Sequence, residues 1–524
     1  MAAIRAAVSS GCEETGLIDK EQRTSPPGKT ALGARHEFWF AAITLTILYL
    51  LFVSIGNRRY VWFDELFTFD IANSPSLKEL WHRELTFDMQ PPAGYLLSRA
   101  SMHIFGATPF GLRFPSMVEF YVGSLVMFLY VQRKAGVAFA TLAVLLLWGA
   151  APGLYYAVEA RPYALVFFSF SCLLLSWDIA IRSKPRRLAL LGVGMATFCL
   201  AIAHVFSVFT LFAFIAAEAV RFWRRRKTDY TLWAALFLPM LAMLIYVPLT
   251  RAFAGVVFAI YASPQTISLF FLNTFGAPIL SFVLLAVLLA ASIPGDGDSR
   301  PAPEFAAEDW ALFACLLVNP ILVNLLLIHR RGTFYDRYCL TSQVAIMVAL
   351  AIFLGLRVRR KRWAAYVGSI VLVLFIVKTQ LWHVLRYPAP RNAAFLASIQ
   401  PSLPIVVGEG QVFVEMNRYE SASILSRLYF LKDPQASIQY MHTNLFQDYA
   451  APDVMKEAGF PFTAKVAQYS SFVSQHRQFL LLGARTEWVF QKLLDHGASI
   501  AFVGGYNDLL YLDKDLYLVT MPSQ

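Results

Sequence analysis

Residues 37–65 read EFWFAAITLTILYLLFVSIGNRRYVWFDE, an apolar run that ends in two arginines and, after a short aromatic stretch, in two acids. A run of about 20 apolar residues is what an α-helix needs to cross the hydrocarbon core of a bilayer. Asp64 and Glu65 therefore stand where the chain first leaves a membrane. Trp62 and Phe63 are the residue types that gather at the boundary between lipid and water. We interpret the acidic pair as held at the membrane surface, where it can act on a lipid-borne substrate.

The composition places the whole chain in a membrane. Of its 524 residues, 57% are hydrophobic and 15% are charged, whereas a soluble protein carries roughly 25% charged residues. The net charge of +11 does not indicate nucleic acid, because the basic residues cluster between apolar runs. The composition therefore predicts a mainly α-helical, polytopic membrane protein whose surroundings are membrane lipids.

Apolar runs recur along the chain and predict about eleven membrane-spanning helices by the length that a crossing requires. The predicted spans are 37–56, 112–131, 136–154, 163–181, 188–203, 205–220, 230–249, 270–293, 309–328, 339–356 and 363–382.

The charge of the loops predicts the orientation. If the N-terminus is cytoplasmic, five loops lie inside, and four of them (132–134, 182–187, 221–227 and 357–362) are strongly basic, as the positive-inside rule favours. The exception is the loop 294–309, which contains Gly295-Asp296-Gly297-Asp298. Residues 1–36 then form a disordered cytoplasmic tail, and residues 57–111 form the first outer loop. An odd number of spans places the C-terminus outside, in what we expect to be the inner cell membrane.

The first outer loop carries a second acidic motif, Asp88-Met89-Gln90-Pro91-Pro92-Ala93-Gly94-Tyr95. The two prolines would hold Asp88 rigidly, and proline is favoured at the start of a helix. Residues 91–105 are apolar with polar interruptions, which predicts a helix that lies along the membrane surface.

Two further outer loops combine charge with tyrosine. Residues 155–163 contain Glu159, Arg161 and Tyr163 around Pro162. Glu159 and Arg161 can be read as an interfacial ion pair, worth about 0–1 kcal/mol if exposed, or as part of a site.

The late loop contains Arg330, Arg331, Arg337 and Tyr338, so arginines gather where the positive-inside rule disfavours them. Arginine's planar fork suits phosphate oxygens. We therefore predict a phosphate site here, with Arg337 as the best single candidate.

Charges within or at the ends of the spans have simpler interpretations. Asp178 lies four residues before Arg182 and Glu218 three before Arg221, spacings that allow local pairing on a helix. His204, at an outer turn, is either a polar edge residue or a metal ligand with a nearby carboxylate.

After about residue 385 the pattern changes to that of a small α/β domain, residues 385–524, with a largely parallel sheet. Strands are predicted at 404–407, 437–441, 479–482 and 500–503, with 509–512 and 516–520 as a possible hairpin. Helices are predicted at 420–431 and 487–496. We interpret Gly408-Glu409-Gly410 as a plain turn, since it lacks the rest of a dinucleotide fingerprint.

Over residues 37–382 the chain resembles the GT-C membrane glycosyltransferases, most of all the bacterial protein mannosyltransferase-like and lipid A aminoarabinose transferase-like branch. The resemblance rests on four motifs in this order: Asp64-Glu65, Asp88-x-x-Pro-Pro-x-x-Tyr95, Glu159-x-Arg161-Pro-Tyr163 and Arg337-Tyr338. Gln90 departs from the pattern, because many relatives carry His or Lys before the prolines. This departure leaves the donor and any metal requirement open.

The resemblance implies inverting transfer of a sugar from a polyprenyl-phosphate donor to the hydroxyl of a glycan, lipid or protein. Asp64 would be the general base, and Glu65 or Asp88 would orient the acceptor or hold a cation. Arg161 and Arg337, with Arg330 and Arg331, would bind the donor phosphate. Glu159, Tyr163, Tyr338 and Tyr95 would contact substrate. The sequence shows no certain cofactor; a divalent metal ion stays open, with Asp88 and His204 as candidate ligands.

Two other classes of protein remain in competition. A lipid or small-molecule transporter or flippase would place its key charges near the bilayer midplane, often in repeated halves, but the acids here cluster at the surface and no repeat is visible. A non-catalytic sensor or scaffold would leave Asp64 merely solvated.

Overall fold

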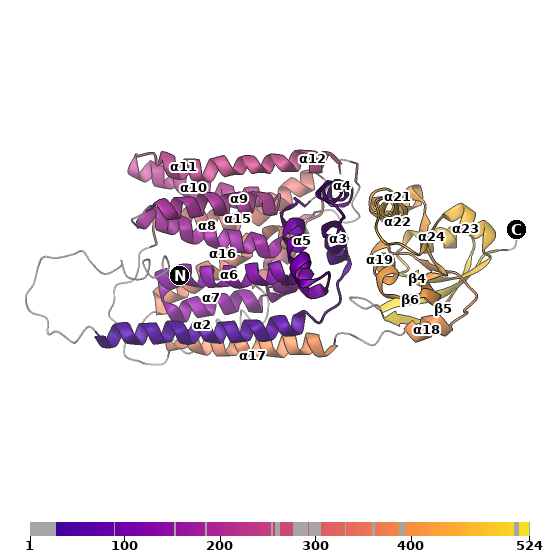
Figure 1. The fold of residues 1–524 in the computed structure, drawn as a ribbon, viewed down its shortest axis with the longest axis horizontal. Coiled ribbons are helices and arrows are strands. Elements are labelled where there is room, and N and C mark those ends of the chain that lie inside the picture. The colour runs from indigo at the N-terminus through magenta and orange to yellow at the C-terminus, as the bar shows by residue number, and fades with distance from the viewer. Residues whose placement is uncertain are drawn as a thin grey trace, which may run out of the picture. The chain divides into compact units, whose positions relative to one another are not determined.

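The structure, a computed structural model, consists of a helical part and a C-terminal part that carries the β-strands (Figure 1). It describes residues 28–524 except 89, 151–152, 184–185, 253–254, 257–261, 276–291, 293–304, 331, 359–361, 387–392, 508–512 and 523–524. The chain divides into two compact units, Met1–Thr44 and Leu45–Gln524. Every contact given below lies within the second unit.

Six helices among the described residues are long and apolar enough to cross a membrane, which makes this a multi-pass membrane protein. They lie in α2 (Gly28–Gly56), α6 (Pro109–Ala135), α8 (Tyr163–Arg182), the segment Tyr230–Ala252, α15 (Ala307–Arg330) and the segment Asp336–Leu356. The segment Tyr230–Ala252 consists of α11 (Tyr230–Phe237), η2 (Leu238–Ile245) and α12 (Tyr246–Ala252), and the segment Asp336–Leu356 consists of η3 (Asp336–Cys339) and most of α16 (Leu340–Val358).

The other predicted spans also coincide with helices wherever the structure describes them. These are α7 (Val137–Gly149), α9 (Arg187–Ala203), α10 (Ser207–Arg225) and α17 (Trp363–Arg386). The predicted span 270–293 lies largely outside the described residues; its start overlaps α13 (Pro264–Phe275). The count of eleven spans, like the orientation, therefore stays a prediction.

The segment predicted to be the first outer loop, residues 57–111, contains three short helices before α6. They are α3 (Phe63–Ala72), α4 (Leu77–Phe87) and α5 (Ala93–Phe105), the last confirming the helix predicted at 91–105. Ser76 caps α4 by accepting a hydrogen bond from the Glu79 backbone N–H, and Asp88 ends it. Asp88 therefore lies in the extended link between two helices, directly before the proline pair.

Ion pairs form at the C-terminal ends of α6, α8 and α10. The predicted local pairs are present: Arg182 Nε lies 2.7 Å from Asp178, and Arg221 lies 2.7 Å from Glu218. The structure adds a longer-range pair, because Lys134 Nζ on α6 lies 2.6 Å from Asp178 on α8. Buried charges need partners to offset their desolvation, and these pairs supply them across neighbouring helices.

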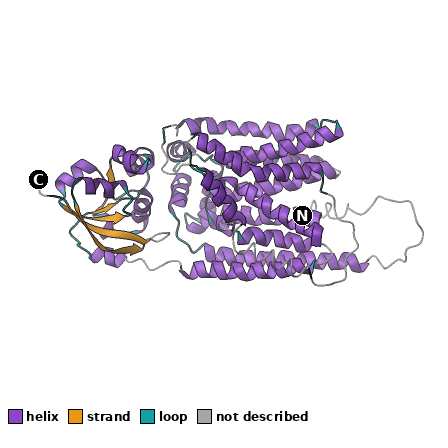
Figure 2. Ribbon diagram, turned by 180° about the vertical axis from the view of Figure 1, so that it is seen from behind, coloured by secondary structure: helices purple, strands orange, loops and turns teal. Residues whose placement is uncertain are grey.

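The C-terminal part contains a six-stranded sheet in the order β3-β2-β1-β4-β6-β5, with helices packed against it (Figure 2). Its strands are β1 (Ile405–Val407), β2 (Leu428–Lys432), β3 (Lys465–Gln468), β4 (Gln478–Gly483), β5 (Ser499–Asn507) and β6 (Asp513–Thr520). The first four strands are parallel, whereas β6 pairs with β4 and β5 antiparallel. Gly408-Glu409-Gly410 forms the turn from β1 into α19 (Gly410–Tyr419), as predicted.

Two predicted elements of this part are wrong. The strand predicted at 437–441 belongs to helix α21 (Pro434–Met441), which Asp433 caps by accepting from the Ala436 N–H. The helix predicted at 420–431 divides into a short helix, α20 (Ala422–Leu425), and strand β2. The burial pattern of β2 reflects its place in the sheet interior, which overrides the local helical spacing. Strand 509–512 lies outside the described residues, and the hairpin partner of β6 is β5 instead.

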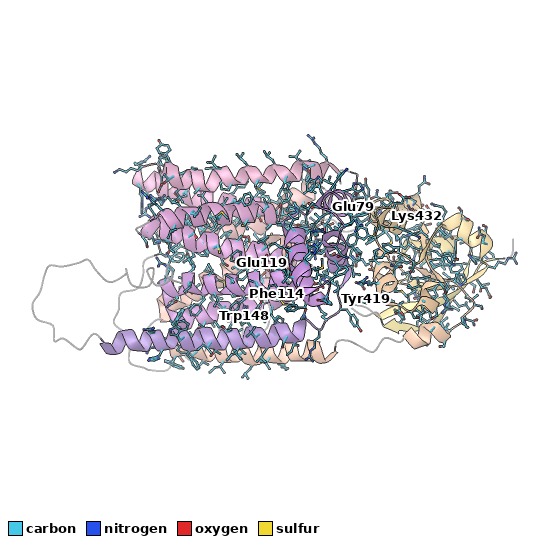
Figure 3. The ribbon with its side chains drawn as sticks, viewed as in Figure 1. Glu79, Phe114, Glu119, Trp148, Tyr419 and Lys432 are labelled. Carbon is cyan, nitrogen blue, oxygen red and sulfur yellow. The ribbon has the colours of Figure 1, made fainter. Side chains whose placement is uncertain are left out.

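Helix α19 joins this sheet to the first outer loop. Glu415 accepts a hydrogen bond from the Phe63 N–H at 2.9 Å. The hydroxyl of Tyr419, labelled in Figure 3, donates to the Val61 carbonyl at 2.8 Å. Phe63 and Leu66 of α3 share one apolar core with Phe413. The Glu415 carboxylate thus accepts from a backbone N–H that has no partner within the helix that carries Asp64 and Glu65.

Candidate active site

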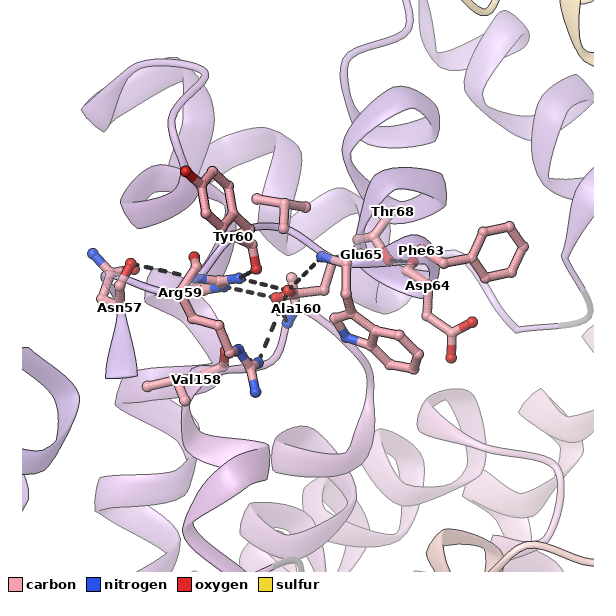
Figure 4. Close-up of polar contacts among 12 residues, drawn as sticks. Asn57, Arg59, Tyr60, Phe63, Asp64, Glu65, Thr68, Val158 and Ala160 are labelled. Atoms are coloured by element: carbon pink, nitrogen blue, oxygen red, sulfur yellow. Dashed lines mark hydrogen bonds and ion pairs between the residues drawn. The ribbon is translucent and has the colours of Figure 1, made fainter. Parts of the chain in front are cut away.

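Asp64 and Glu65 lie in the first turn of α3 but point in different directions (Figure 4). Successive residues of an α-helix are about 100° apart around its axis. Glu65 points into a cluster of backbone groups from the loop before α3 and from Ala160, whereas the Asp64 carboxylate points away from that cluster. Two adjacent acids therefore have two different surroundings.

Glu65 is fully buried and paired with Arg113 of α6. Its two carboxylate oxygens accept from Arg113 at 2.7 and 2.6 Å, and one also accepts from the Ala160 N–H at 2.8 Å. Burial alone would raise the pKa of Glu65, but the charge and hydrogen bonds of Arg113 outweigh it and lower the pKa. With both oxygens occupied, the geometry supports a positioning role for Glu65: it ties α3, α6 and the segment that contains Ala160 together.

Arg113 was not singled out from the sequence. Its remaining N–H groups donate to the carbonyl oxygens of Arg59 and Tyr60, each at 2.8 Å. An arginine near the start of a membrane helix looks like an ordinary interfacial charge, and only its complete burial distinguishes it. Once the burial of Arg113 is known, a carboxylate partner is expected, because a buried arginine requires one.

Asp64 faces Arg337, which precedes α16. Arg337 lies in η3, and its Nη1 is 3.3 Å from the Asp64 carboxylate. Both side chains retain some exposure, 17% for Asp64 and 25% for Arg337. The Arg337 guanidinium lies over the Tyr335 and Tyr163 rings, at 4.6 and 5.7 Å from their centres. The fold therefore brings the predicted base beside the best predicted phosphate ligand, across 273 residues of sequence.

A second carboxylate–arginine pair joins Asp88 to Arg161. Arg161 Nη1 lies 2.7 Å from Asp88, and the Tyr95 hydroxyl donates to the same oxygen at 2.5 Å. The other Asp88 oxygen accepts from the Gln90 N–H at 3.2 Å. Burial alone would lower the pKa of Arg161, but the charges of Asp88 and Asp64 raise it. The second predicted arginine is thus charged and held against the second acidic motif.

Glu159, Tyr163 and Tyr338 lie beside these pairs. Glu159 is buried, and burial followed by the negative charges of Glu65 and Asp64 raises its pKa to about 8. The Tyr163 and Tyr338 rings both pack against His204, at centroid distances of 6.0 and 5.5 Å. These predicted substrate contacts therefore form the walls around the two arginines.

The other predicted phosphate ligands do not join this cluster in the described structure. Arg330 is exposed in the last turn of α15, and Arg331 lies outside the described residues. No group of three or more His, Cys, Asp or Glu side chains within the described ranges could hold a metal ion. Asp88 and His204 have no such third ligand among those residues, so the structure offers no built metal site there.

A small pocket opens beside Arg161. It is lined by Gln90, Pro91, Tyr95, Arg161 and Glu119, among others, and its free volume of about 20 Å³ holds little more than a water molecule. Glu119, labelled in Figure 3, reaches it from α6. A ligand much larger than water therefore needs the walls of this pocket to move or must bind elsewhere.

Glu84, on α4, is a buried acid that the sequence analysis did not single out. Its side chain is fully buried, and neither oxygen has a hydrogen-bond partner among the described residues. Burial, followed by the charge of Asp88, raises its pKa to about 9. Glu84 is therefore protonated at neutral pH.

The raised pKa of Glu84 makes stability depend on pH. Because the folded protein holds this proton more tightly than the unfolded chain, the stabilisation is complete below the ordinary value of 4.5 and is lost as pH rises towards about 9. We expect Glu84→Gln, which mimics the neutral acid, to raise the thermal midpoint at pH 8 and to flatten its decline between pH 5 and 9. Thermal unfolding of the purified protein checks this, with Glu79→Gln on the same helix as control. Equal pH slopes in both variants and the wild type would contradict it.

The helical bundle, the outer helices with two carboxylate–arginine pairs and the C-terminal sheet together define the class of the fold.

Comparison with solved structures shows which known protein has a similar fold. The chain is similar to ArnT from Cupriavidus metallidurans in the apo state, with a TM-score of 0.54, 14% identity, and coverage of 94% of this chain and 98% of that one. It also matches ArnT of the same organism bound to undecaprenyl phosphate, with a TM-score of 0.49, 13% identity, and coverage of 93% and 98%. At this identity the first likeness shows the fold alone. No family model matches the sequence. No curated protein matches it either.

Proposed function

We propose that this protein is an inverting glycosyltransferase of the cell membrane. It moves a sugar from a polyprenyl-phosphate carrier to an acceptor hydroxyl on the extracytoplasmic side, where the C-terminal domain also lies. The observation that carries this proposal is the pairing of Asp64 with Arg337 at 3.3 Å, next to a second pair of Asp88 with Arg161 at 2.7 Å. A base and a phosphate site are what such a transfer requires.

The arrangement supports a single displacement. The acceptor oxygen attacks the anomeric carbon, its proton passes to the Asp64 carboxylate, and the bond from that carbon to the phosphate oxygen breaks. The leaving phosphate keeps the electron pair, and Arg161 and Arg337 stabilise the charge that develops on it.

The two ion pairs also suggest how the donor prepares the site. In the structure each arginine is held by an aspartate. A phosphate that takes over Arg337 would release Asp64, which would then be free to accept the acceptor's proton. Donor binding would thus precede activation of the base.

The position of the paired charges favours a transferase over a flippase. Asp64 belongs to a short helix before α6, Asp88 lies in the link between α4 and α5, and Arg161 lies in the link between η1 (Gly153–Val158) and α8. A transporter would concentrate such charges within broken spans near the midplane. The fold and the motifs favour the aminoarabinose transferase-like or protein mannosyltransferase-like branch, with a glycan, lipid or protein as acceptor.

Substitution of Arg337 tests the phosphate site. We expect Arg337→Ala to raise the KM for the donor and to lower kcat, together reducing kcat/KM about 10²–10³-fold, because it removes a charge that stabilises the leaving group. The assay is release of polyprenyl phosphate by the protein in nanodiscs. Arg58→Ala, an exposed arginine of the first outer loop, is the control. An unchanged kcat/KM in Arg337→Ala would reject the assigned role.

A second experiment identifies the donor sugar and the acceptor. Mass spectrometry of surface glycans and glycolipids from a deletion strain, compared with the parent, should show loss of one glycosyl group. Its mass identifies the sugar, and the molecule that loses it identifies the acceptor. Identical spectra in both strains would count against a transferase of the cell envelope.

A further inference from the structure

Three buried nitrogen atoms beside Asp64 and Asp88 lack a hydrogen-bond acceptor among the described residues. They are Nε of Arg161, Nε of Arg337 and Nε2 of His204. They lie far apart in the sequence: Arg161 precedes α8, His204 lies between α9 and α10, and Arg337 lies in η3. A buried donor without an acceptor costs about 1–3 kcal/mol. Three such donors in one place indicate a site that an anion completes.

The contacts of His204 determine which of its nitrogens is the donor. Its Nδ1 faces the backbone N–H of Phe206 at 3.3 Å and therefore accepts. In a neutral imidazole the proton must then be on Nε2. Burial, followed by the positive charges of Arg161 and Arg337, lowers the pKa of His204 to about 3. The ring is therefore neutral and presents an N–H at Nε2.

The surroundings favour an anion over a metal ion at this nitrogen. A metal ligand would need an unprotonated Nε2, but the Phe206 N–H occupies the other acceptor position. Arg161 and Arg337 would also repel a cation. The Tyr163 and Tyr338 rings fix the plane of the imidazole, so the direction of the Nε2–H bond is set before any ligand arrives.

We propose that His204 is a neutral hydrogen-bond donor to the phosphate of the polyprenyl carrier, completing with Arg161 and Arg337 a site built from three links of the chain. This assignment rests on the proposed function. The two arginines supply charge, whereas a neutral N–H adds direction without further charge. His204 would therefore contribute to recognition of the phosphate and would not transfer a proton.

Binding of a polyprenyl phosphate and of the matching polyprenol in detergent micelles tests this role. Hydrogen bonds to charged groups correspond to roughly 10–100-fold in affinity. We expect His204→Phe to weaken binding of the phosphate by about tenfold or more and to leave binding of the polyprenol unchanged. His204→Gln, whose side-chain amide can place an N–H near the position of Nε2, should recover most of the affinity. Polyprenol binding and the thermal midpoint report whether each variant is folded.

The outcomes separate the two proposals. If the wild type binds the phosphate no better than the polyprenol, the proposed function fails. If the wild type prefers the phosphate but His204→Phe retains that preference, only the role of His204 is wrong. If His204→Gln behaves like His204→Phe and a chelator lowers wild-type affinity, His204 is a metal ligand instead.

Discussion

Asp64→Asn should abolish sugar transfer while leaving the protein folded. Asparagine has nearly the same shape but cannot accept the acceptor's proton, and loss of a general base typically costs about 10²–10⁴ in rate. The effect on stability should be small, because the Asp64–Arg337 pair is partly exposed and such pairs contribute about 0–1 kcal/mol.

Turnover and the thermal midpoint of the purified protein should be measured together. Asp70→Asn is the matched control, because it makes the same change on the same helix. Burial raises the pKa of Asp70 to about 6. This variant should retain activity. Undiminished transfer by folded Asp64→Asn would remove Asp64 from the mechanism, and loss of folding in that variant alone would mark Asp64 as structural.

Glu65→Gln, one residue further along the same helix, should have the opposite effect and destabilise the protein strongly. It leaves the fully buried Arg113 guanidinium without its counter-charge, and breaking such a pair costs about 3–5 kcal/mol. The expected result is a large drop in thermal midpoint and poor recovery of folded protein from membranes. The depressed pKa of Glu65 has the same origin: its stabilisation is present above the ordinary carboxyl pKa and is lost as pH falls below it.

A double substitution tests whether the loss of stability comes from the uncompensated charge of Arg113. Glu65→Gln with Arg113→Met removes both charges and should recover part of the loss, because no uncompensated charge stays buried. Glu79→Gln is the control, since the Glu79–Arg83 pair on α4 is partly exposed at its acid and should cost less than about 1 kcal/mol. A Glu65→Gln variant as stable as this control would contradict the anchoring role.

The spans could be predicted because membrane helices are encoded locally. The cost of placing backbone and charge in lipid acts on each segment separately, so α2, α6 and α8 follow from apolar runs alone. The paired acids could be located for the same reason: Asp64 and Asp88 stand out against an apolar background. The helix at 91–105 followed from its prolines and its apolar spacing.

The C-terminal part was harder to predict because its elements depend on the sheet that they join. Residues 428–432 have helical spacing but form the interior strand β2, and residues 437–441 look like a strand but continue a helix capped by Asp433. Short apolar runs fit either structure until their neighbours are known.

The sequence by itself determined that this is a polytopic membrane protein with acids and arginines in the loops between its spans. It also determined which residue types could serve as base and phosphate ligands. Only the tertiary structure decided that Asp64 meets Arg337, that Asp88 meets Arg161, and that Glu65 is bound to Arg113. The physical reason is distance along the chain: periodicity reports the nearest few residues, whereas an ion pair forms wherever helix packing brings opposite charges together.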